Sequence, residues 1–490
     1  TPGGTLDSAI ERLGHLRDLG VDLVELMPVA AFPGERGWGY DGVSLYAVHE
    51  AYGGPEALQR FVDAAHGMGM GVCLDVVYNH LGPAGNYLPV FGPYFTDEHE
   101  TPWGWAVNLD QDGAAEVRAF VVDNALRWLR DFHVDALRLD AVHALVDESE
   151  AHLLSDLSEA VAALADEVGR PLGLVAESDL NDAAMVTPVA EGGLGMDGQW
   201  DDDLHHALHA LLTGERHGYY VDFGAPEALR TVLEEVFLHA GTHSTFRGVT
   251  WGAPVADDVD RRRFVVCSQN HDQVGNRALG DRPSRVLDDG QLVAAAAIVL
   301  LGPFSPMLFQ GEEWGTKRPF QYFTDHDPEL GLLVSAGRRN EFAGHGWEKM
   351  YGGSVDVPDP QARSTYLDSR VPWAEIDDPD HPDSRRHHQI LTAYRALIGL
   401  LKSEPDLASG AADATAVEIG EHGSWLRMRR GSIDVLLVLS AAAQLVPVPA
   451  EDRTDATELL FAFGEDAAST VELGSEGVLL PGHGVAVLRR

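Results

Sequence analysis

Three acidic residues stand where an apolar run of the sequence gives way to a loop. Asp140 occurs in Ala-Leu-Arg-Leu-Asp-Ala, Glu177 in Gly-Leu-Val-Ala-Glu-Ser, and Asp272 in Ser-Gln-Asn-His-Asp-Gln. Two carboxyl groups are sufficient to hydrolyse an acetal, because one protonates the leaving oxygen while the other attacks the anomeric carbon. In an enzyme that retains the configuration these groups lie about 5–5.5 Å apart. Acids at several strand ends are the residue types that this chemistry requires.

Each acid taken alone has an ordinary structural explanation. Asp140 could cap the following helix, and Arg138 could be only its ion-pair partner on the same side of the strand. His271 could be a buried histidine with satisfied hydrogen bonds. Three acids at strand ends, with an arginine and a histidine beside them, favour a site instead. The arginine would keep the attacking carboxylate ionised, and grouping with partial burial would raise the pKa of the acid.

These residues need a scaffold that brings several strand ends to one place. The first two-thirds of the sequence alternates short apolar runs with amphipathic stretches, which predicts a parallel sheet wrapped by helices. In an α/β (β/α)8 TIM barrel, catalytic groups converge at the carboxyl ends of the strands. The expected strands are Val21–Met27, Gly71–Tyr78, Val134–Asp140, Leu172–Glu177, Gln199–Asp201, Phe264–Asn270 and Pro306–Gln310. The expected helices include Leu6–Leu19, Pro55–Met68, Ala114–Phe132 and Glu150–Val168.

Two regions depart from this alternation. Residues 81–111 follow the strand that carries Asp75 and His80, and they show no helical period. Because long loops inside compact domains are usually functional, we expect a short inserted subdomain there. It follows the strand Gly71–Tyr78, which is barrel strand 3 when the first barrel strand is counted before this chain. From about Glu404 alternating strands predict a C-terminal antiparallel β domain, so the expected domains are 1–403 and 404–490. The segment Pro379–Arg386 is expected to be a polar loop before the last helix.

Composition restricts the possible partners. The 490 residues include 77 acidic and 35 basic side chains, a formal net charge of −42. Such a surface repels phosphate groups, which excludes nucleic acid and anionic lipid as expected partners. No apolar run of about 18 residues and no secretory signal is visible, so we expect no membrane contact and a cytoplasmic location. The two cysteines, Cys73 and Cys267, stand in apolar runs and are expected to be buried thiols.

Four segments resemble those of the α-amylase superfamily (glycoside hydrolase family 13): Asp75-Val-Val-Tyr-Asn-His80, Leu137-Arg-Leu-Asp140, Val175-Ala-Glu177 and Gln269-Asn-His-Asp272. The resemblance covers roughly residues 6–400. It implies that Asp140 is the nucleophile, Glu177 the general acid/base, and Asp272 the carboxylate that holds sugar hydroxyls in the distorted transition state. The substrate-binding residues implied by it are Tyr40, Asp75, His80, Arg138 and His271.

Several longer stretches look like the trehalohydrolase branch of that superfamily. They include Trp38-Gly-Tyr-Asp-Gly42, Phe91-Gly-Pro-Tyr-Phe95, Thr101-Pro-Trp-Gly104 and Arg138-Leu-Asp-Ala-Val-His143. This resemblance implies cleavage of the α-1,4 bond next to the terminal trehalose of maltooligosyltrehalose. It adds His143 to the substrate-binding residues, together with Trp103. Loop aromatics form either sugar-stacking platforms or a small core of the loop: Tyr94, Phe95, Trp103 and Trp105.

Members of this branch usually begin with a β-sandwich and a first barrel strand. Here Thr5 already introduces the first barrel helix, so we expect both features to be missing from this chain. The carboxylates of the 81–111 loop are scattered, which does not predict the cage of six to eight oxygens that calcium needs. We therefore expect neither a metal nor a cofactor. The adjacent pairs His205-His206 and His387-His388 also lack ligand spacing.

Two other functions remain open at this point. A glycogen branching or debranching enzyme of the same superfamily would keep the three carboxylates and differ in its loops. A catalytically inactive carbohydrate-binding barrel would have lost one or more of them, whereas all three are present here. The expected partners are maltooligosyltrehalose and related α-glucans, and the sequence does not indicate an oligomeric state.

Overall fold

The computed structural model describes residues 3–343, 353, 355–449, 452, 457–464, 472–474 and 476–490. The chain forms two compact units. Unit 1 comprises Thr1–Trp200, Tyr322–Arg338 and Asp359–Leu367. Unit 2 comprises Asp201–Gln321, Arg339–Pro358 and Asp368–Arg490.

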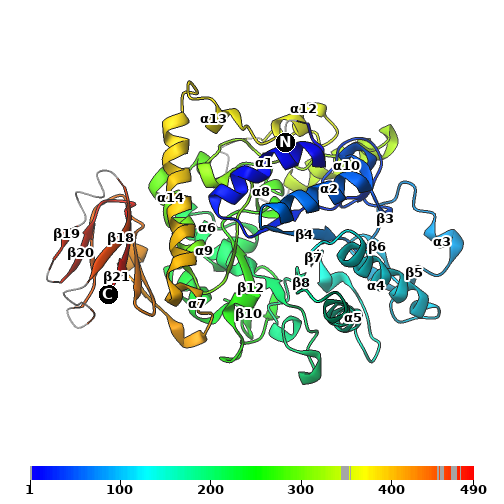
Figure 1. The fold of residues 1–490 in the computed structure, drawn as a ribbon, viewed down its shortest axis with the longest axis horizontal. Helices are drawn as coiled ribbons and strands as arrows, with labels where there is room; N and C mark the ends of the chain where they lie inside the picture. Colours follow the sequence, from blue (N-terminus) through cyan, green and yellow to red (C-terminus); the bar gives the residue numbers. More distant parts are fainter. Residues whose placement is uncertain are drawn as a thin grey trace. The chain divides into compact units, whose positions relative to one another are not determined.

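Unit 1 contains parallel strands in the order β1-β4-β7-β8-β9. Their bounds are β1 (Leu23–Leu26), β4 (Gly71–Val76), β7 (Ala136–Leu139), β8 (Gly173–Ala176) and β9 (Gly198–Trp200). Helices α2 (Gly54–Gly67), α4 (Ala114–Asp131) and α5 (Leu153–Val168) connect consecutive strands of this order. Figure 1 shows β4, β7 and β8 beside one another with α4 and α5 to one side. This is the repeating strand–helix arrangement that the sequence predicts.

The first helix, α1 (Leu6–Leu19), has the predicted bounds and clear stop signals. The Thr5 side chain accepts a hydrogen bond from the Ser8 backbone, and the Ser8 hydroxyl caps the Thr5 backbone in return, which is a capping box. Gly20 ends the helix at φ 101°, a left-handed conformation that costs glycine little. The stretch before β1 is therefore helical, as expected. Strand β1 ends the strand order of unit 1, and its Leu23 is exposed.

The 81–111 segment is more ordered than its sequence suggests. It contains a short helix, α3 (Leu88–Phe91), and an antiparallel hairpin of β5 (Phe95–Thr101) and β6 (Gly104–Val107). A second hairpin, β2 (Ala30–Ala31) with β3 (Ser44–Val48), precedes α2. Both hairpins escape the sequence prediction because pairing between strands, with a register shift in each, replaces regular alternation.

Unit 2 continues the strand–helix alternation with α6 (Asp202–Thr213), α7 (Pro226–Glu235), β12 (Phe264–Cys267), α9 (Asp289–Leu301) and β13 (Ser305–Met307). Strands β12 and β13 are parallel. The last helix, α14, spans Ser384–Ser403. The predicted polar loop Pro379–Arg386 is thus wrong in its last three residues, because Ser384, Arg385 and Arg386 form the first turn of α14.

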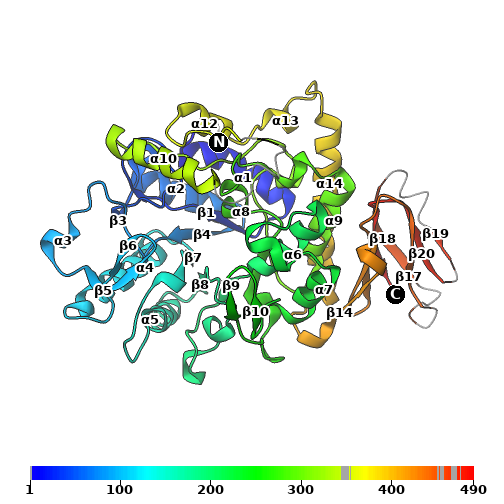
Figure 2. The ribbon, with the colours of Figure 1, turned by 180° about the vertical axis from the view of Figure 1, so that it is seen from behind.

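Antiparallel strands follow α14, as predicted. One sheet has the order β14-β15-β16-β21-β18, and the other has the order β17-β20-β19. Figure 2 labels β17, β18, β19 and β20 of these sheets near the C-terminus. The bounds are β14 (Thr415–Ile419), β15 (Trp425–Arg430), β16 (Ile433–Val438), β17 (Gln444–Pro447), β18 (Glu458–Phe463), β19 (Glu472–Leu473), β20 (Gly477–Leu480) and β21 (Val485–Arg489). Buried aliphatic side chains form the core between these sheets, including Leu436, Val446 and Val478.

Both cysteines lie in strand interiors. Cys73 is in β4 and Cys267 ends β12, and each is a buried cysteine outside any disulfide. Burial raises the pKa of Cys73 well above its ordinary value, so the thiol stays protonated. Within the described residues, no helix is long and apolar enough to span a bilayer.

A buried amide joins α4 to the end of β4. The side-chain oxygen of Asn124 accepts hydrogen bonds from Tyr78 Oη at 2.8 Å and Trp128 Nε1 at 3.1 Å. Its nitrogen donates to the Leu45 carbonyl at 2.9 Å. All of these contacts are buried, so each polar group depends on Asn124 for its hydrogen bond. The amide therefore connects α4 to the Tyr78 side chain and to the Leu45 backbone.

We expect Asn124→Ala to destabilise the protein strongly. It would leave three buried polar groups without a partner, at about 1–3 kcal/mol each, so the free energy of unfolding should fall by about 3 kcal/mol or more. Urea unfolding followed by circular dichroism measures this change. Asp123→Ala, an exposed neighbour on the same helix, serves as the control. A change for Asn124→Ala no larger than for the control would contradict the assigned role.

Candidate active site

A fully buried arginine forms the centre of the polar groups at the strand ends of unit 1. Arg138 Nη1 donates to Asp75 Oδ2 and to Asp140 Oδ1, each at 2.8 Å. Arg138 Nη2 forms an ion pair with Glu177 Oε1 at 2.7 Å. One guanidinium therefore contacts three carboxylates from three neighbouring strands. The guanidinium also lies 4.4 Å from the ring centroid of Trp200, a cation–π distance.

The strand register explains this convergence. Asp75 of β4 is directly opposite Arg138 of β7. Asp140 follows two residues later and therefore points to the same side as Arg138. The Glu177 backbone N–H donates to the Leu139 carbonyl at 3.0 Å, which continues the β7–β8 ladder to the strand ends. The predicted grouping of Asp140 and Glu177 thus follows directly from parallel pairing.

Asp140 has a second partner that the sequence prediction missed. Asn79 Nδ2 donates to the side chain of Asp140 at 2.8 Å and to its backbone carbonyl at 2.7 Å. The suggested helix-capping role for Asp140 is wrong, because the next turn is capped by Ala141 without a side-chain hydrogen bond. The Asp140 carboxylate is instead held between Arg138 and Asn79. Asn79 could have been recognised from its place in the Asp75–His80 segment, one residue before the predicted His80.

Glu177 is oriented by the backbone that follows Asp140. The Ala141 N–H donates to Glu177 Oε2 at 2.6 Å, and the Val142 N–H donates to the Glu177 carbonyl at 3.0 Å. Ala141 adopts φ 40°, an uncommon left-handed conformation for a residue with a β carbon. This turn presents its N–H groups to Glu177. The strained residue Ala141 therefore contacts Glu177, the residue predicted to donate the proton.

Tyr40 and Asp75 form the next pair. Tyr40 Oη donates to Asp75 Oδ2 at 2.6 Å, and Arg138 lies 6.0 Å from the Tyr40 ring centroid. Burial raises the pKa of Asp75 to about 7, although Arg138 acts in the opposite direction. Because its oxygen is engaged by both Tyr40 and Arg138, Asp75 orients these two side chains.

His80 and Trp103 form an aromatic pair beside Asp140. Their rings are stacked at a centroid distance of 4.6 Å and an interplanar angle of 7°. Burial lowers the pKa of His80, and its Nε2 lies 3.0 Å from the Tyr40 carbonyl oxygen. Trp103 is 50% exposed, which argues against a place in the loop core. Tyr94, by contrast, packs its edge against Phe120 of α4 at 5.5 Å.

The remaining predicted residues have more limited contacts. His143 Nδ1 lies 3.5 Å from Asp179, and both side chains are partly exposed. In unit 2, His271 is buried, and its Nε2 lies 3.6 Å from Asp272 Oδ1. Both belong to the short helix α8 (His271–Gly275), where Asn276 Nδ2 donates to Asp272 Oδ1 at 3.2 Å. Unit 1 thus brings Tyr40, Asp75, His80, Arg138, Asp140 and Glu177 together through direct contacts, with Trp103 on His80.

The described residues contain one group with the spacing of a metal site. Single ligand atoms of His99, Asp110 and Glu148 lie within 4.8 Å of one another. His99 and Asp110 already contact each other at 2.8 Å, and three such groups fall short of a calcium cage. The histidine pairs have other partners: His205 Nδ1 contacts the Ser268 carbonyl, and His387 Nδ1 the Trp314 carbonyl. None of these groups leads us to propose a metal.

Comparison with known proteins agrees with this geometry. A family model for the catalytic domain of alpha amylase matches residues 2–92. A Salmonella typhimurium protein provisionally described as an alpha amylase has a crystal structure that matches with a TM-score of 0.86 at 36% identity. The match covers 100% of this chain and 80% of that one. The barrel strands and the grouped carboxylates therefore define a glycoside hydrolase of the α-amylase superfamily.

Two relatives define the family more narrowly. The malto-oligosyltrehalose trehalohydrolase of Arthrobacter ramosus is 50% identical over 490 residues, covering 100% of this chain and 80% of the relative. The enzyme of the same name from Mycobacterium tuberculosis is 48% identical over 92% of this chain and 76% of its own length. The chain belongs to the malto-oligosyltrehalose trehalohydrolase family.

The raised pKa of Asp75 predicts a pH-dependent stability. Between 3.8, the ordinary pKa, and about 7 the unfolded chain has lost the Asp75 proton while the folded chain still holds it. The folded state therefore loses stability as the pH rises through this interval, at up to about 1.4 kcal/mol per pH unit. Asp75→Asn cannot titrate, so its unfolding free energy relative to the parent should increase across the interval and level off above it.

Urea unfolding of both proteins at a series of pH values measures this difference. Asp123→Asn, an exposed aspartate of the same unit, is the matched control and should give a curve parallel to that of the parent. Parallel curves for Asp75→Asn and the parent would show that Asp75 keeps an ordinary pKa.

Proposed function

We propose that the chain cleaves the α-1,4 bond next to the terminal trehalose of maltooligosyltrehalose and releases trehalose and a maltooligosaccharide. Membership of the trehalohydrolase family supports this substrate. The observation that carries the chemistry is the contact of one buried arginine with Asp75, Asp140 and Glu177. An inactive barrel is not favoured, because the three predicted catalytic carboxylates, Asp140, Glu177 and Asp272, are all present.

Asp140 acts as the nucleophile in this proposal. Hydrogen bonds from Arg138 and Asn79 stabilise its charged form. The carboxylate attacks the anomeric carbon, and the bond to the leaving oxygen breaks as a covalent glycosyl-enzyme forms. The guanidinium and the amide also hold the attacking oxygen atoms in place, which lowers the entropic cost of reaching the transition state.

Glu177 acts as the general acid and then as the base. In the first step it gives its proton to the oxygen of the departing trehalose. In the second step the same carboxylate takes a proton from water, whose oxygen attacks the anomeric carbon and releases Asp140. The Ala141 N–H donates to one Glu177 oxygen, and this fixes the side chain in both steps.

The surrounding residues bind the sugar at the cleavage point. Tyr40 and Trp103 offer aromatic faces for stacking, and His80 and His143 offer polar ring atoms. Asp272 and His271 are proposed to hold sugar hydroxyls in the distorted transition state. The aldohexose units are neutral, so the net charge of −42 imposes no long-range repulsion on them.

We also propose a cytoplasmic location. Neither Cys73 nor Cys267 forms a disulfide, which fits a reducing compartment. Fractionation of the producing cells, with the protein recovered outside the cytoplasmic fraction, would contradict this assignment.

The substrate assignment is tested by product analysis. The protein is incubated with maltotriosyltrehalose and, separately, with maltopentaose, and products are resolved by chromatography. We expect free trehalose and maltotriose from the first substrate and cleavage at least about tenfold slower of the second. Asp140→Asn is the negative control and should release neither product. Rapid cleavage of maltopentaose would instead indicate a general α-1,4 amylase, and a changed iodine spectrum of amylose would indicate branching.

The two carboxylate roles are separated by rescue with azide. An α-maltosyl fluoride, whose leaving group needs no proton, is supplied to Asp140→Gly and to Glu177→Ala. Without the nucleophile, azide should attack from the face opposite the fluoride and give a β-azide. Without the acid/base, azide should attack the covalent intermediate and give an α-azide. The reverse pattern of products would exchange the two assignments.

A further inference from the structure

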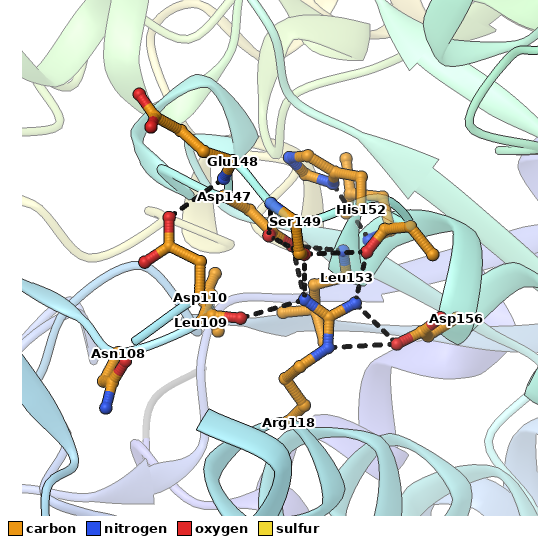
Figure 3. A network of polar contacts seen from close by, with 12 residues as sticks. Asn108, Leu109, Asp110, Arg118, Asp147, Glu148, Ser149, His152, Leu153 and Asp156 are labelled. Atoms are coloured by element: carbon orange, nitrogen blue, oxygen red, sulfur yellow. Dashed lines mark hydrogen bonds and ion pairs between the residues drawn. The ribbon is translucent and has the colours of Figure 1, made fainter. Parts of the chain in front are cut away.

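A charged network outside the catalytic carboxylates joins two loops that border the site (Figure 3). Its centre is Arg118, in the first turns of α4. Arg118 Nη1 donates to the Leu109 carbonyl at 3.1 Å and Asp147 Oδ2 at 2.6 Å. Arg118 Nη2 donates to the Ala151 carbonyl and Asp156 Oδ2, each at 2.6 Å. We call Arg118, Asp110 and Asp147 the Arg118 network.

The two aspartates extend the network into the backbone. Asp147 is completely buried, and its Oδ2 also accepts the Leu153 N–H at 2.6 Å. Although burial opposes it, hydrogen bonds from Ser149 and Leu153 hold the pKa of Asp147 below its usual value. Asp110 Oδ2 accepts the Glu148 N–H at 2.9 Å and contacts His99 at 2.8 Å. Asp110 therefore connects the β5–β6 hairpin to residues 147–149.

Both connected loops lead directly to proposed catalytic or sugar-binding residues. Residues 141–152 follow the nucleophile Asp140, and their first two N–H groups donate to Glu177. Their far end is held by the Arg118 network. Residues 81–111 carry Trp103, which stacks on His80. Near their end, Asp110 belongs to the Arg118 network and the Leu109 carbonyl accepts a hydrogen bond from Arg118. Each loop is thus fixed at one end by the site and at the other by Arg118 and Asp110.

We propose that Arg118 and Asp110 are positioning residues that fix the Trp103 loop relative to the loop after Asp140. The inference rests on the proposed function of Asp140, Glu177 and Trp103. It explains why one guanidinium contacts loop residues 9, 29 and 33 positions away in the sequence. A solvated surface ion pair would contribute little, but the Arg118 side chain is only 14% exposed.

The charge and shape of arginine suit this role. Its five N–H donors lie in one plane, and here they reach two carboxylates and two backbone carbonyls at once. Ser149 Oγ also donates to the Ala151 carbonyl at 3.0 Å. Losing Arg118 would therefore remove its hydrogen bond to the Leu109 carbonyl and leave Ala151 with the Ser149 hydroxyl. A displacement of about 1 Å at a reacting group can lower the rate about 100-fold. The network can therefore affect catalysis without touching the substrate.

The test uses three variants of the full chain with a matched control. Arg118→Ala removes all of the contacts, Arg118→Lys keeps the charge but not the planar set of donors, and Asp110→Asn disturbs only the hairpin connection. Arg130→Ala is the control, because Arg130 lies on the same helix and makes an exposed pair with Asp131. The folded fraction of each variant is measured by circular dichroism at the assay temperature.

Both kcat and KM are measured for every protein on maltotriosyltrehalose and on maltopentaose, and the two kcat/KM values are compared. Their ratio does not depend on how much enzyme is folded, so a purely structural role cannot change it. We expect Arg118→Ala to lower kcat on maltotriosyltrehalose about 10- to 100-fold per folded molecule and to change the ratio at least about fivefold. Arg118→Lys and Asp110→Asn should fall between it and the parent, and Arg130→Ala should equal the parent.

A parent-like ratio and a parent-like kcat per folded molecule in Arg118→Ala and Asp110→Asn would overturn the proposal. If the parent itself released no trehalose, the proposed function would fail instead, so the two failures are distinguishable. Hydrogen exchange gives a readout without substrate. Asp110→Asn should speed exchange in peptides from 95–107 and 141–152 together, while peptides from α14 stay unchanged. Faster exchange in only one of these loops would also contradict the proposed connection.

Discussion

The burial of Arg138 is the constraint on which the site depends. Moving an arginine out of water is costly unless its charge is matched and its donors are engaged. Here the matching groups are Asp75, Asp140 and Glu177, which come from three adjacent strands. The strands must therefore keep their register, because a slip of one residue would turn a carboxylate away from the guanidinium. The grouping of the carboxylates and the pairing of the strands depend on the same ion cluster.

Helix α4 supports this cluster from two points along its length. Asn124 is in the middle of the helix and accepts a hydrogen bond from Tyr78, which immediately precedes Asn79, the residue whose amide donates to Asp140. Arg118, near the start of the same helix, contacts the loops that follow Asp140 and precede α4. Polar side chains of a helix outside the strands thus hold segments that lie next to Asp140. Such supporting contacts commonly decide whether a site is held accurately enough to work.

Much of the scaffold and the main carboxylates could be predicted from the sequence. Apolar runs that end in Asp140 or Glu177 are local signals, and parallel pairing then brings their ends to one edge. The helix Leu6–Leu19 was equally visible, because its cap residues lie next to its apolar stripe. These features need only neighbouring residues to be recognised.

The parts that escaped prediction depend on partners far apart in the sequence. Asn79 and Asp140 are separated by 61 residues, and Arg118 and Asp147 by 29. The β5–β6 hairpin has a register shift that conceals its alternation. Local sequence left a helix cap as an alternative for Asp140, because it does not show that Arg138 and Asn79 donate hydrogen bonds to its carboxylate. Pairings of this kind become visible only when the strands are placed side by side.

The two buried cysteines allow local opening of the fold to be measured chemically. Cys73 stands two residues before Asp75 on β4, and Cys267 ends β12, five residues before Asp272. A thiol reagent can reach either sulfur only when the strand around it separates from its neighbours. The rate of modification at each cysteine therefore measures how often its strand opens locally. Cys73 reports on a strand of unit 1, and Cys267 reports on a strand of unit 2. The two modification rates thus report local opening of the strands that lie close in sequence to Asp75 and Asp272.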